Sequence, residues 1–293
     1  MRRVIRWAVF LIVVGVPTAW FITRASPLDS EGLASLDGDA ARGEQVFTAA
    51  GCASCHYAPD AEDDAKLILA GGQRFASDFG TFVAPNISPD PNAGIGSWSL
   101  AEFVSAVKAG VSPDGQHYYP AFPYASYNKM TDADVVDLWA FWQSLPADAT
   151  PSQPHELSFP FNIRRSVWGW KFLYLNDDWV MTDTATDEIE RGRYLVEALA
   201  HCGECHTSRT ALGGLDRANW LAGAPNPSGR GRIPTLAPDE FTWPAEDIAY
   251  YLETGFTPDF DSVGGHMAAV VKNFSKLPAS DREAVAAYIK ALP

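Results

Sequence analysis

The sequence is short of basic residues. Its 22 Lys and Arg stand against 36 Asp and Glu, which gives a formal net charge of −14 at pH 7. A negative charge of this size disfavours nonspecific binding to nucleic acid and to anionic lipid surfaces. A basic protein partner would suit such a surface, although an acidic surface also serves solubility alone.

Long apolar runs are rare too, and the one that stands out lies at the N-terminus. It extends over sixteen residues, from Trp7 to Ile22, whereas a membrane-spanning helix needs roughly 17 to 25. No clean small-x-small cleavage site follows the run, and Trp20 and Phe21 lie at its end, as interfacial aromatic residues do. Residues 1–25 are therefore predicted to be a retained membrane anchor, with a cleaved signal peptide as the alternative.

Positive charge is distributed unevenly about this run. Arg2, Arg3 and Arg6 come before or at its start, and only Arg24 follows closely. This asymmetry places the N-terminus in the cytoplasm and the rest of the chain outside, whether or not the segment is cleaved. The predicted location is the periplasmic side of a bacterial inner membrane, anchored there or soluble after cleavage.

Cysteine is scarce, with four residues in the chain. An even number in an exported protein usually suggests disulfides, but the spacing here indicates another role. The cysteines form two C-x-x-C-H motifs, Cys52-Ala-Ser-Cys55-His56 and Cys202-Gly-Glu-Cys205-His206. A lone C-x-x-C could be a redox pair or half a zinc site, yet the attached His and the duplication argue against both.

This motif attaches c-type haem, because two thiols bond to the haem vinyl groups and the adjacent imidazole is placed to ligate the iron. The sequence therefore predicts two covalently bound haem c groups. Their attachment residues are Cys52, Cys55, Cys202 and Cys205, and their proximal iron ligands are His56 and His206.

The two motifs belong to an internal repeat that extends over a whole domain. Each is preceded by an amphipathic helix start, and Gly43 and Gly192 occupy equivalent places in it. Such a glycine allows the N-terminal helix to cross the C-terminal helix closely; the alternative is an ordinary glycine at a helix start.

Later helices are predicted in pairs as well. One pair begins near Trp98 and Trp243 and stops at Gly110 and Gly255, and the final pair covers Asp132 to Leu145 and Ser280 to Leu292. Candidate N-caps for the first pair are Ser97 or Ser99, and Thr242.

The predicted fold class is all-α, with two tandem cytochrome c-type domains at residues 37–146 and 188–293, each a few helices around one haem. Residues 147–187 between them are too aromatic for a free linker, so we expect a packed connector with a helical turn from Ile163 to Leu175. Arg164 and Arg165 in it could pair with haem propionates or form ordinary surface salt bridges.

Several segments together carry a family resemblance. They are Arg42-Gly43, the two haem motifs, the run from Pro85 to Asp90 before Gly94 to Ser99, and the run from Tyr119 to Tyr124. From about Asp37 onward the chain resembles the cytochrome c subunits of bacterial membrane-bound alcohol, aldehyde and gluconate dehydrogenases, and their free-standing dihaem relatives. The third haem motif of those subunits is absent, so the likeness is to the dihaem branch.

A second axial ligand to each iron is expected, most often Met. The chain has four methionines, one of them the initiator. In the second half Met267, twelve residues after Gly255, is assigned as the distal ligand, with a buried core Met as the alternative role and His266 as a lesser rival.

The first half departs from this pattern. Twelve residues after Gly110 stands Phe122, where the family's Pro-Ala-Met-Pro would place the ligand. Met130 is the preferred candidate, because it lies in the loop that must cross the distal face. His117, or no protein ligand at all, are the alternatives, and Met181 in the connector is expected to be a packing residue.

The resemblance implies electron carriage between a periplasmic donor and a respiratory acceptor. We expect an electron-transfer protein with no catalytic residues of its own, whose redox partners are a dehydrogenase, a quinol-linked complex, an oxidase or a small cytochrome. The alternative is a dihaem enzyme, of the peroxidase or thiosulfate-oxidising type, with an open or unusually ligated first haem. Phe122 supports this alternative, because it replaces the expected methionine ligand and cannot bind iron.

Overall fold

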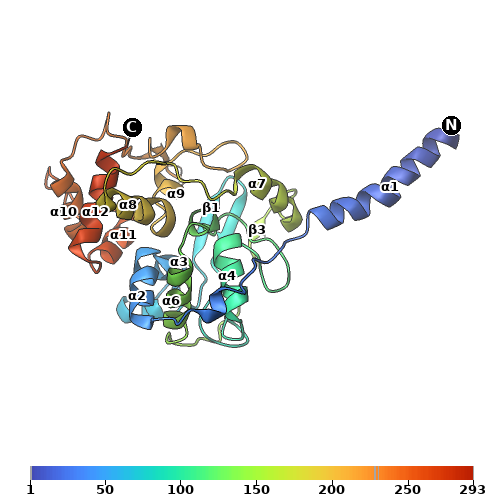
Figure 1. The fold of residues 1–293 in the computed structure, drawn as a ribbon, viewed down its shortest axis with the longest axis horizontal. Helices are drawn as coiled ribbons and strands as arrows, with labels where there is room; N and C mark the ends of the chain where they lie inside the picture. The colour runs from blue at the N-terminus through green and yellow to red at the C-terminus, as the bar shows by residue number, and fades with distance from the viewer. Residues whose placement is uncertain (1, 228, 230, 293) are drawn as a thin grey trace.

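The computed structural model describes residues 2–227, 229 and 231–292. An N-terminal helix, α1 (Arg2–Ile22), projects away from a helical body that contains the rest of the chain (Figure 1). Within the described residues α1 is the helix that is long and apolar enough to cross a membrane, and its apolar window is not buried against the body. The predicted N-terminal apolar segment is thus a helix.

The first half of the body is built from short helices and one small sheet. Its elements are η1 (Leu33–Ser35), α2 (Ala40–Ala49), α3 (Cys52–His56), η2 (Asp63–Leu67), β1 (Arg74–Ser77), β2 (Gly80–Val83), α4 (Leu100–Ala109), α5 (Tyr124–Tyr127) and α6 (Asp132–Trp142). In Figure 1, α2, α4 and α6 lie in the lower part of the body, and the helices of the second half lie above them.

Residues 147–187, which connect the two halves, pack on the body. Strand β3 (Glu156–Leu157) pairs antiparallel with β2, in the register Gly80 to Leu157, and completes the sheet β1-β2-β3. The 3-10 turn η3 (Arg164–Ser166) then leads into α7 (Val167–Tyr174), so the helix expected between Ile163 and Leu175 is confirmed.

The second half repeats the order of helices around its own motif. Its elements are α8 (Asp187–Arg193), η4 (Tyr194–Leu199, a π-helix), α9 (Gly203–His206), η5 (Arg217–Asn219), β4 (Ala224–Pro225), β5 (Arg232–Ile233), α10 (Ala245–Thr254), α11 (Met267–Phe274) and α12 (Ala279–Lys290). The described chain is largely helical, as expected for an all-α protein, and the two small sheets are additions that the sequence did not predict.

The first and last helices of each half cross at a glycine. A Cβ on Gly43 would lie 1.9 Å from the carbonyl oxygen of Asp137 in α6, and a Cβ on Gly192 would lie 1.9 Å from that of Ala284 in α12. No side chain fits at such a distance, so the close-crossing interpretation of both glycines is confirmed.

An arginine beside each glycine ties the same helices together. Arg42 Nε donates to Asp137 Oδ2 at 2.7 Å, and Arg191 Nη2 donates to Asp281 Oδ2 at 2.8 Å. These two-pronged contacts raise the pKa of each arginine, mainly through the hydrogen bond to its carboxylate.

Helix ends follow the predicted caps with one exception. Ser99 accepts from Glu102 N in a capping box, and Gly110 and Gly255 end α4 and α10 with φ of 61° and 78°. Thr242 was the wrong N-cap, because α10 begins at Ala245 after Pro244, whose fixed φ suits a helix entrance. The last helices end at Trp142 and Lys290, slightly before the predicted limits.

Candidate functional site

The first C-x-x-C-H motif forms a single helical turn, α3. Gly51 precedes it in the left-handed region, with φ of 65°, and turns the chain from α2 into α3. His56 Nδ1 lies 2.9 Å from the carbonyl oxygen of Pro85. A carbonyl oxygen can only accept, so Nδ1 carries the proton and Nε2 keeps its lone pair.

The second motif repeats this arrangement. α9 carries Cys205 and His206, with Cys202 at its N-cap, and His206 Nδ1 lies 2.9 Å from the carbonyl oxygen of Pro234. The residue before the motif is His201, which adopts φ of 43° at the place of Gly51. A left-handed non-glycine residue is uncommon and costs free energy, so the surroundings hold His201 in place.

Both motif imidazoles are kept neutral by their surroundings. Burial lowers the pKa of His56 to about 4, against a smaller opposing effect of its hydrogen bond to Pro85. Burial also lowers the pKa of His206, and the Pro234 carbonyl again opposes. A metal-ligating histidine must be neutral and is usually oriented through its other ring nitrogen, so both turns fit a covalently attached haem with Nε2 as the iron ligand.

The structure separates the two distal candidates of the second half. His266 is exposed, whereas its neighbour Met267 is partly buried and packs on the hydrophobic core as the first residue of α11. The sequence analysis placed Met267 between the helix stop at Gly255 and the last helix and did not predict α11. The inward position favours Met267 over His266, and its role as ligand stays a prediction.

In the first half the two candidate residues, Met130 and His117, lie in different surroundings. Met130 is 1% exposed and belongs to the core. It follows α5, whose Tyr127 hydroxyl donates to the carbonyl of Ala50, two residues before Cys52, at 2.9 Å. The loop with Met130 is therefore tied to the first motif, which supports the prediction that Met130 is the distal ligand.

His117 contacts the segment that follows α1. Its Nε2 donates to the backbone carbonyl of Thr23, just beyond α1, at 3.1 Å. The ring is buried, and its pKa is lowered by burial first and by Lys171 and Arg165 to a smaller extent, while the Thr23 bond opposes. This engagement disfavours His117 as an iron ligand. Met181 is buried in the core, as expected of a packing residue.

Aromatic rings surround Phe122, at the place of the family's methionine. The rings of Tyr118, Tyr124 and Tyr127 lie 6.1, 6.2 and 5.9 Å from it, all edge-on. Phe122 therefore contributes packing at this position and offers no atom that could bind iron.

The fold brings the two motifs together, which the sequence did not predict. Asn273 Nδ2 of α11 donates to Ser54 Oγ of the first motif at 3.1 Å. Burial first, and then the nearby Cys205 thiol, raise the pKa of Cys55 to about 11. Cys55 and Cys205, the second cysteine of each motif, thus interact electrostatically across the junction between the halves.

The backbone carbonyls of Pro85 and Pro234 are functional groups that sequence reasoning did not assign. A signal existed, because the two prolines follow their motif histidines at nearly the same separation, 29 and 28 residues. The internal repeat showed that the two loops correspond. Residue type, however, does not predict which backbone carbonyl orients an imidazole.

Behind the second motif lies a chain of buried polar groups that no sequence pattern predicted. Trp220, which packs on Gly203, donates from Nε1 to the Tyr288 hydroxyl at 3.0 Å. That hydroxyl donates to Glu197 Oε1 at 2.7 Å, and Val180 N donates to Glu197 Oε2 at 2.6 Å. The π-helix that holds Glu197 is therefore fixed to α12 and to the residues before α8.

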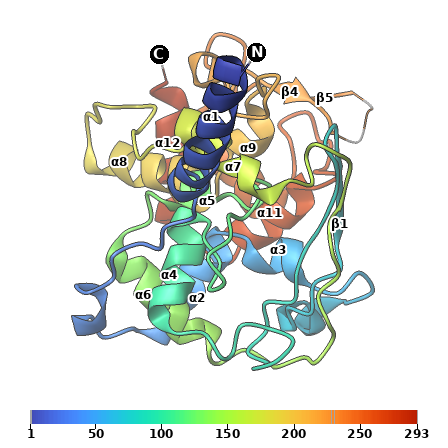
Figure 2. The same cartoon turned by 90° about the vertical axis from the view of Figure 1, so that its right-hand side faces the viewer.

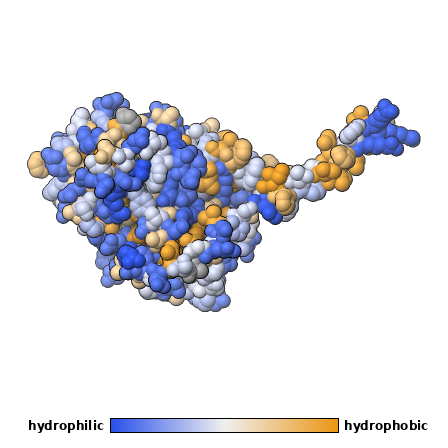
Figure 3. All heavy atoms as spheres, in the orientation of Figure 1, coloured by the Kyte–Doolittle hydropathy of each residue, from blue (hydrophilic) through white to orange (hydrophobic). Residues whose placement is uncertain are grey.

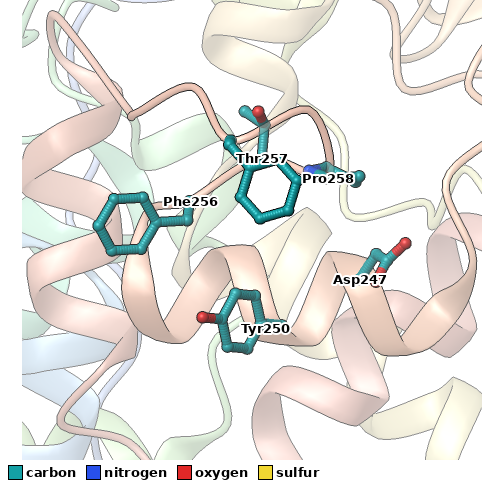
Figure 4. Close-up of a pocket in the computed structure, with 6 residues that line it drawn as sticks. Asp247, Tyr250, Phe256, Thr257 and Pro258 are labelled. Carbon is teal, nitrogen blue, oxygen red and sulfur yellow. The ribbon is translucent and has the colours of Figure 1, made fainter.

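A surface hollow in the second half is distinct from the motifs. It lies between α10 and the loop that follows Gly255, and Tyr250 and Phe256 point into it together with Thr257 and Pro258 (Figure 4). No motif residue lines this hollow, so it plays no part in attaching haem.

Comparison with known proteins agrees with this geometry. The cytochrome c family model matches residues 40–146. A protein of Cereibacter sphaeroides described as diheme cytochrome c-type is 52% identical over 293 residues, which cover 100% of this chain and 99% of that protein.

Larger relatives match over part of their length. The fructose dehydrogenase cytochrome subunit of Gluconobacter japonicus is 37% identical over 92% of this chain and 56% of its own. The gluconate 2-dehydrogenase cytochrome c subunit of Pantoea cypripedii is 31% identical over 86% of this chain and 59% of its own. The chain thus spans just over half the length of these subunits.

The fold and the matched family define an electron-transfer cytochrome of the c type, which implies covalently bound haem c. More particularly, the chain belongs to the family that contains this dihaem cytochrome and the cytochrome subunits of bacterial fructose, alcohol and gluconate dehydrogenases.

Proposed function

We propose that this chain is a membrane-anchored dihaem cytochrome c that carries electrons between a periplasmic donor and a respiratory acceptor. Residues 37–146 and 188–293 would be its two cytochrome c domains, and 147–187 a connector packed on both. The observation that carries the proposal is the repeated turn in which the motif histidine donates from Nδ1 to a proline carbonyl, at 2.9 Å in both halves. Each turn has what one haem c needs.

The residues take matching roles in the two halves. Cys52, Cys55, Cys202 and Cys205 would attach the haems, His56 and His206 would be the proximal ligands, and Met130 and Met267 the distal ligands. The bound haems supply the redox chemistry. The chain orients the imidazoles through Pro85 and Pro234, and partial burial lowers their pKa values and keeps them neutral.

The junction between the halves supports a relay within one molecule. Ser54 and Asn273 join the first motif to α11, and Cys55 and Cys205 interact electrostatically. Haems attached at these places would lie close enough to exchange electrons. An electron carrier needs its haems to lie close together. A dihaem enzyme with one reactive haem also needs an open coordination position on that iron.

Partner and location rest on the relatives and on α1. Relatives named as cytochrome subunits of dehydrogenases support a dehydrogenase as donor, with a quinol-linked complex as the other donor class. The acceptor would be an oxidase or a small cytochrome. The apolar α1, with Arg2, Arg3 and Arg6 at its start, supports anchoring to the inner membrane with the body in the periplasm.

A redox titration of the purified full chain, followed by optical spectra, tests the carrier function. Two low-spin haems that are reduced and reoxidised reversibly, with no turnover of peroxide or thiosulfate, are expected. A high-spin first haem that turns over either compound would contradict the carrier and favour the dihaem enzyme. Co-purification after mild detergent extraction would identify the donor: a dehydrogenase is expected, and a quinol-linked complex would replace it.

A further inference from the structure

The connector presents an apolar surface that the fold leaves uncovered. Five large hydrophobic side chains within residues 159–173 are exposed, and we call them the connector patch: Phe159, Phe161, Ile163, Phe172 and Leu173. Phe172 is 76% exposed and Leu173 is 57% exposed. An apolar group of this size on a water-soluble surface marks an interaction site.

Helix α7 has one face in the body and one face free. Val167 is buried and Lys171 Nζ donates to the carbonyls of Ala109 and Gly110 at 2.6 and 2.8 Å, so this side holds the helix in place. On the other side Trp168 and Phe172, one turn apart, stack with ring centroids 5.6 Å apart. The outward face of a firmly held helix is thus apolar.

The patch adjoins the end of α1. The Arg165 guanidinium lies over the Trp20 ring, 3.7 Å from its centroid, and Arg165 Nε donates to Thr23 Oγ1 at 2.8 Å. Seen along α1, helix α7 lies beside its base (Figure 2), and apolar surface continues from α1 onto the adjoining part of the body (Figure 3). Arg165, for which a contact with a haem propionate or a surface salt bridge was considered, thus contacts α1, and the propionate contact stays a prediction.

The chain between α1 and the body is short and fastened. His117 donates to the Thr23 carbonyl at 3.1 Å, and Leu28 N donates to Ser105 Oγ at 3.1 Å. The body is held within a few residues of Ile22 instead of on a flexible stalk. The end of α1 and the start of α7 would therefore lie at the same depth in a membrane.

From these contacts we infer that the connector patch inserts into the membrane interface, as a second and monotopic contact beside the α1 anchor. Trp20, at the end of α1, would sit at the boundary between acyl chains and headgroups, where Trp is enriched. The Arg165 contact then sets η3 and α7 at the same level, with Phe172 and Leu173 directed into the acyl region. The inference rests on the proposed anchoring by α1.

Charge around the patch is consistent with a lipid surface. Arg24 lies over the Phe21 ring at the end of α1, 4.3 Å from its centroid, and Arg164 in the connector lies over the Tyr119 ring, 5.2 Å from its centroid. The net charge of −14 disfavours adsorption by charge alone, so the contact depends on apolar side chains with arginines at headgroup level.

Cysteine accessibility in vesicles tests the inference. The four native cysteines are consumed by haem attachment, so a single introduced cysteine can be alkylated selectively. We would place it in the full chain by Phe172→Cys, with Phe260→Cys as a matched exposed control far from α1 and Val13→Cys as a control in the middle of α1. Phe260 is 94% exposed. Each purified protein would be reconstituted in phosphatidylcholine vesicles and treated with a membrane-impermeant maleimide, and an unchanged haem spectrum would show correct folding.

Alkylation at position 172 is expected to be at least about tenfold slower than at 260, because the reactive thiolate forms poorly away from water. Equal rates at 172 and 260, with 13 protected, would overturn the patch contact and leave the anchor intact. Reaction at 13 would instead show that α1 is not an anchor. Protection at 172 in native membranes but not in vesicles would overturn the lipid contact in favour of a protein partner on the same face.

Discussion

The Tyr127 ring packs edge-on against the His201 imidazole, with ring centroids 5.5 Å apart. Tyr127 also donates its hydroxyl to Ala50, which precedes the first haem motif, and His201 directly precedes the second. Burial lowers the pKa of His201, so the ring is neutral in this contact. One aromatic pair therefore joins the residues that precede the two motifs, so the position of one motif depends on that of the other.

A double-mutant cycle measures this link. Tyr127→Leu and His201→Gly each remove one ring, and a coupling free energy of about 0.5–1.5 kcal/mol is expected for a packed aromatic pair. The readout is the free energy of unfolding in denaturant. A cycle of Tyr127→Leu with the distant Phe256→Leu should couple by less than about 0.5 kcal/mol. Additivity in the first cycle would show that the contact holds nothing together.

Helix crossing predicts the effect of adding a single methyl group. Gly43→Ala or Gly192→Ala would force a Cβ against a backbone carbonyl, and each should lower the free energy of unfolding by about 3 kcal/mol or more. Gly169→Ala in α7 is the matched control, because its Cβ would meet nothing within 4 Å. That substitution should be neutral or stabilise by up to about 1 kcal/mol. Equal effects at all three sites would refute the close crossing.

His117 predicts a pH dependence at the junction with α1. Its folded pKa lies below the unfolded value of 6.5, so the unfolded chain takes up the proton first as the pH falls. Stability is therefore full above pH 6.5 and declines as the pH drops below it toward the folded pKa. Denaturant unfolding at several pH values, in wild type and His117→Gln, checks this. The variant should lose part of the decline, and identical curves would show that His117 does not titrate as described.

Local signals made much of this structure predictable. Helix starts are predictable at Ser99 and Thr131, and helix ends at Gly110 and Gly255. The capping hydrogen bonds and φ values involved depend only on neighbouring residues. Each C-x-x-C-H motif predicts covalent haem attachment from only five residues. Thr242 misled because Pro244 provides a stronger helix entrance two residues later.

What the sequence could not predict depends on contacts between distant residues. Helix α11 at Met267 follows a glycine-rich loop without an N-cap side chain, and β2 pairs with β3 across more than 70 residues. Tyr127 meets His201, and Asn273 meets Ser54, only because the two halves dock. Periodicity and capping say nothing about docking, so the closeness of the two motifs emerged from the structure alone.

In the proposed function each haem is held between a motif histidine and a methionine. The most direct test is the magnetic circular dichroism spectrum of the oxidised full chain, in the charge-transfer region that reports Met ligation of low-spin ferric haem, for wild type, Met130→Leu, Met267→Leu and Met181→Leu. Wild type should show Met ligation at both haems, each of the first two variants should lose it at one haem with a lowered potential, and Met181→Leu should match wild type. A wild-type spectrum with one high-spin or Met-free haem, unchanged by Met130→Leu, would contradict the account.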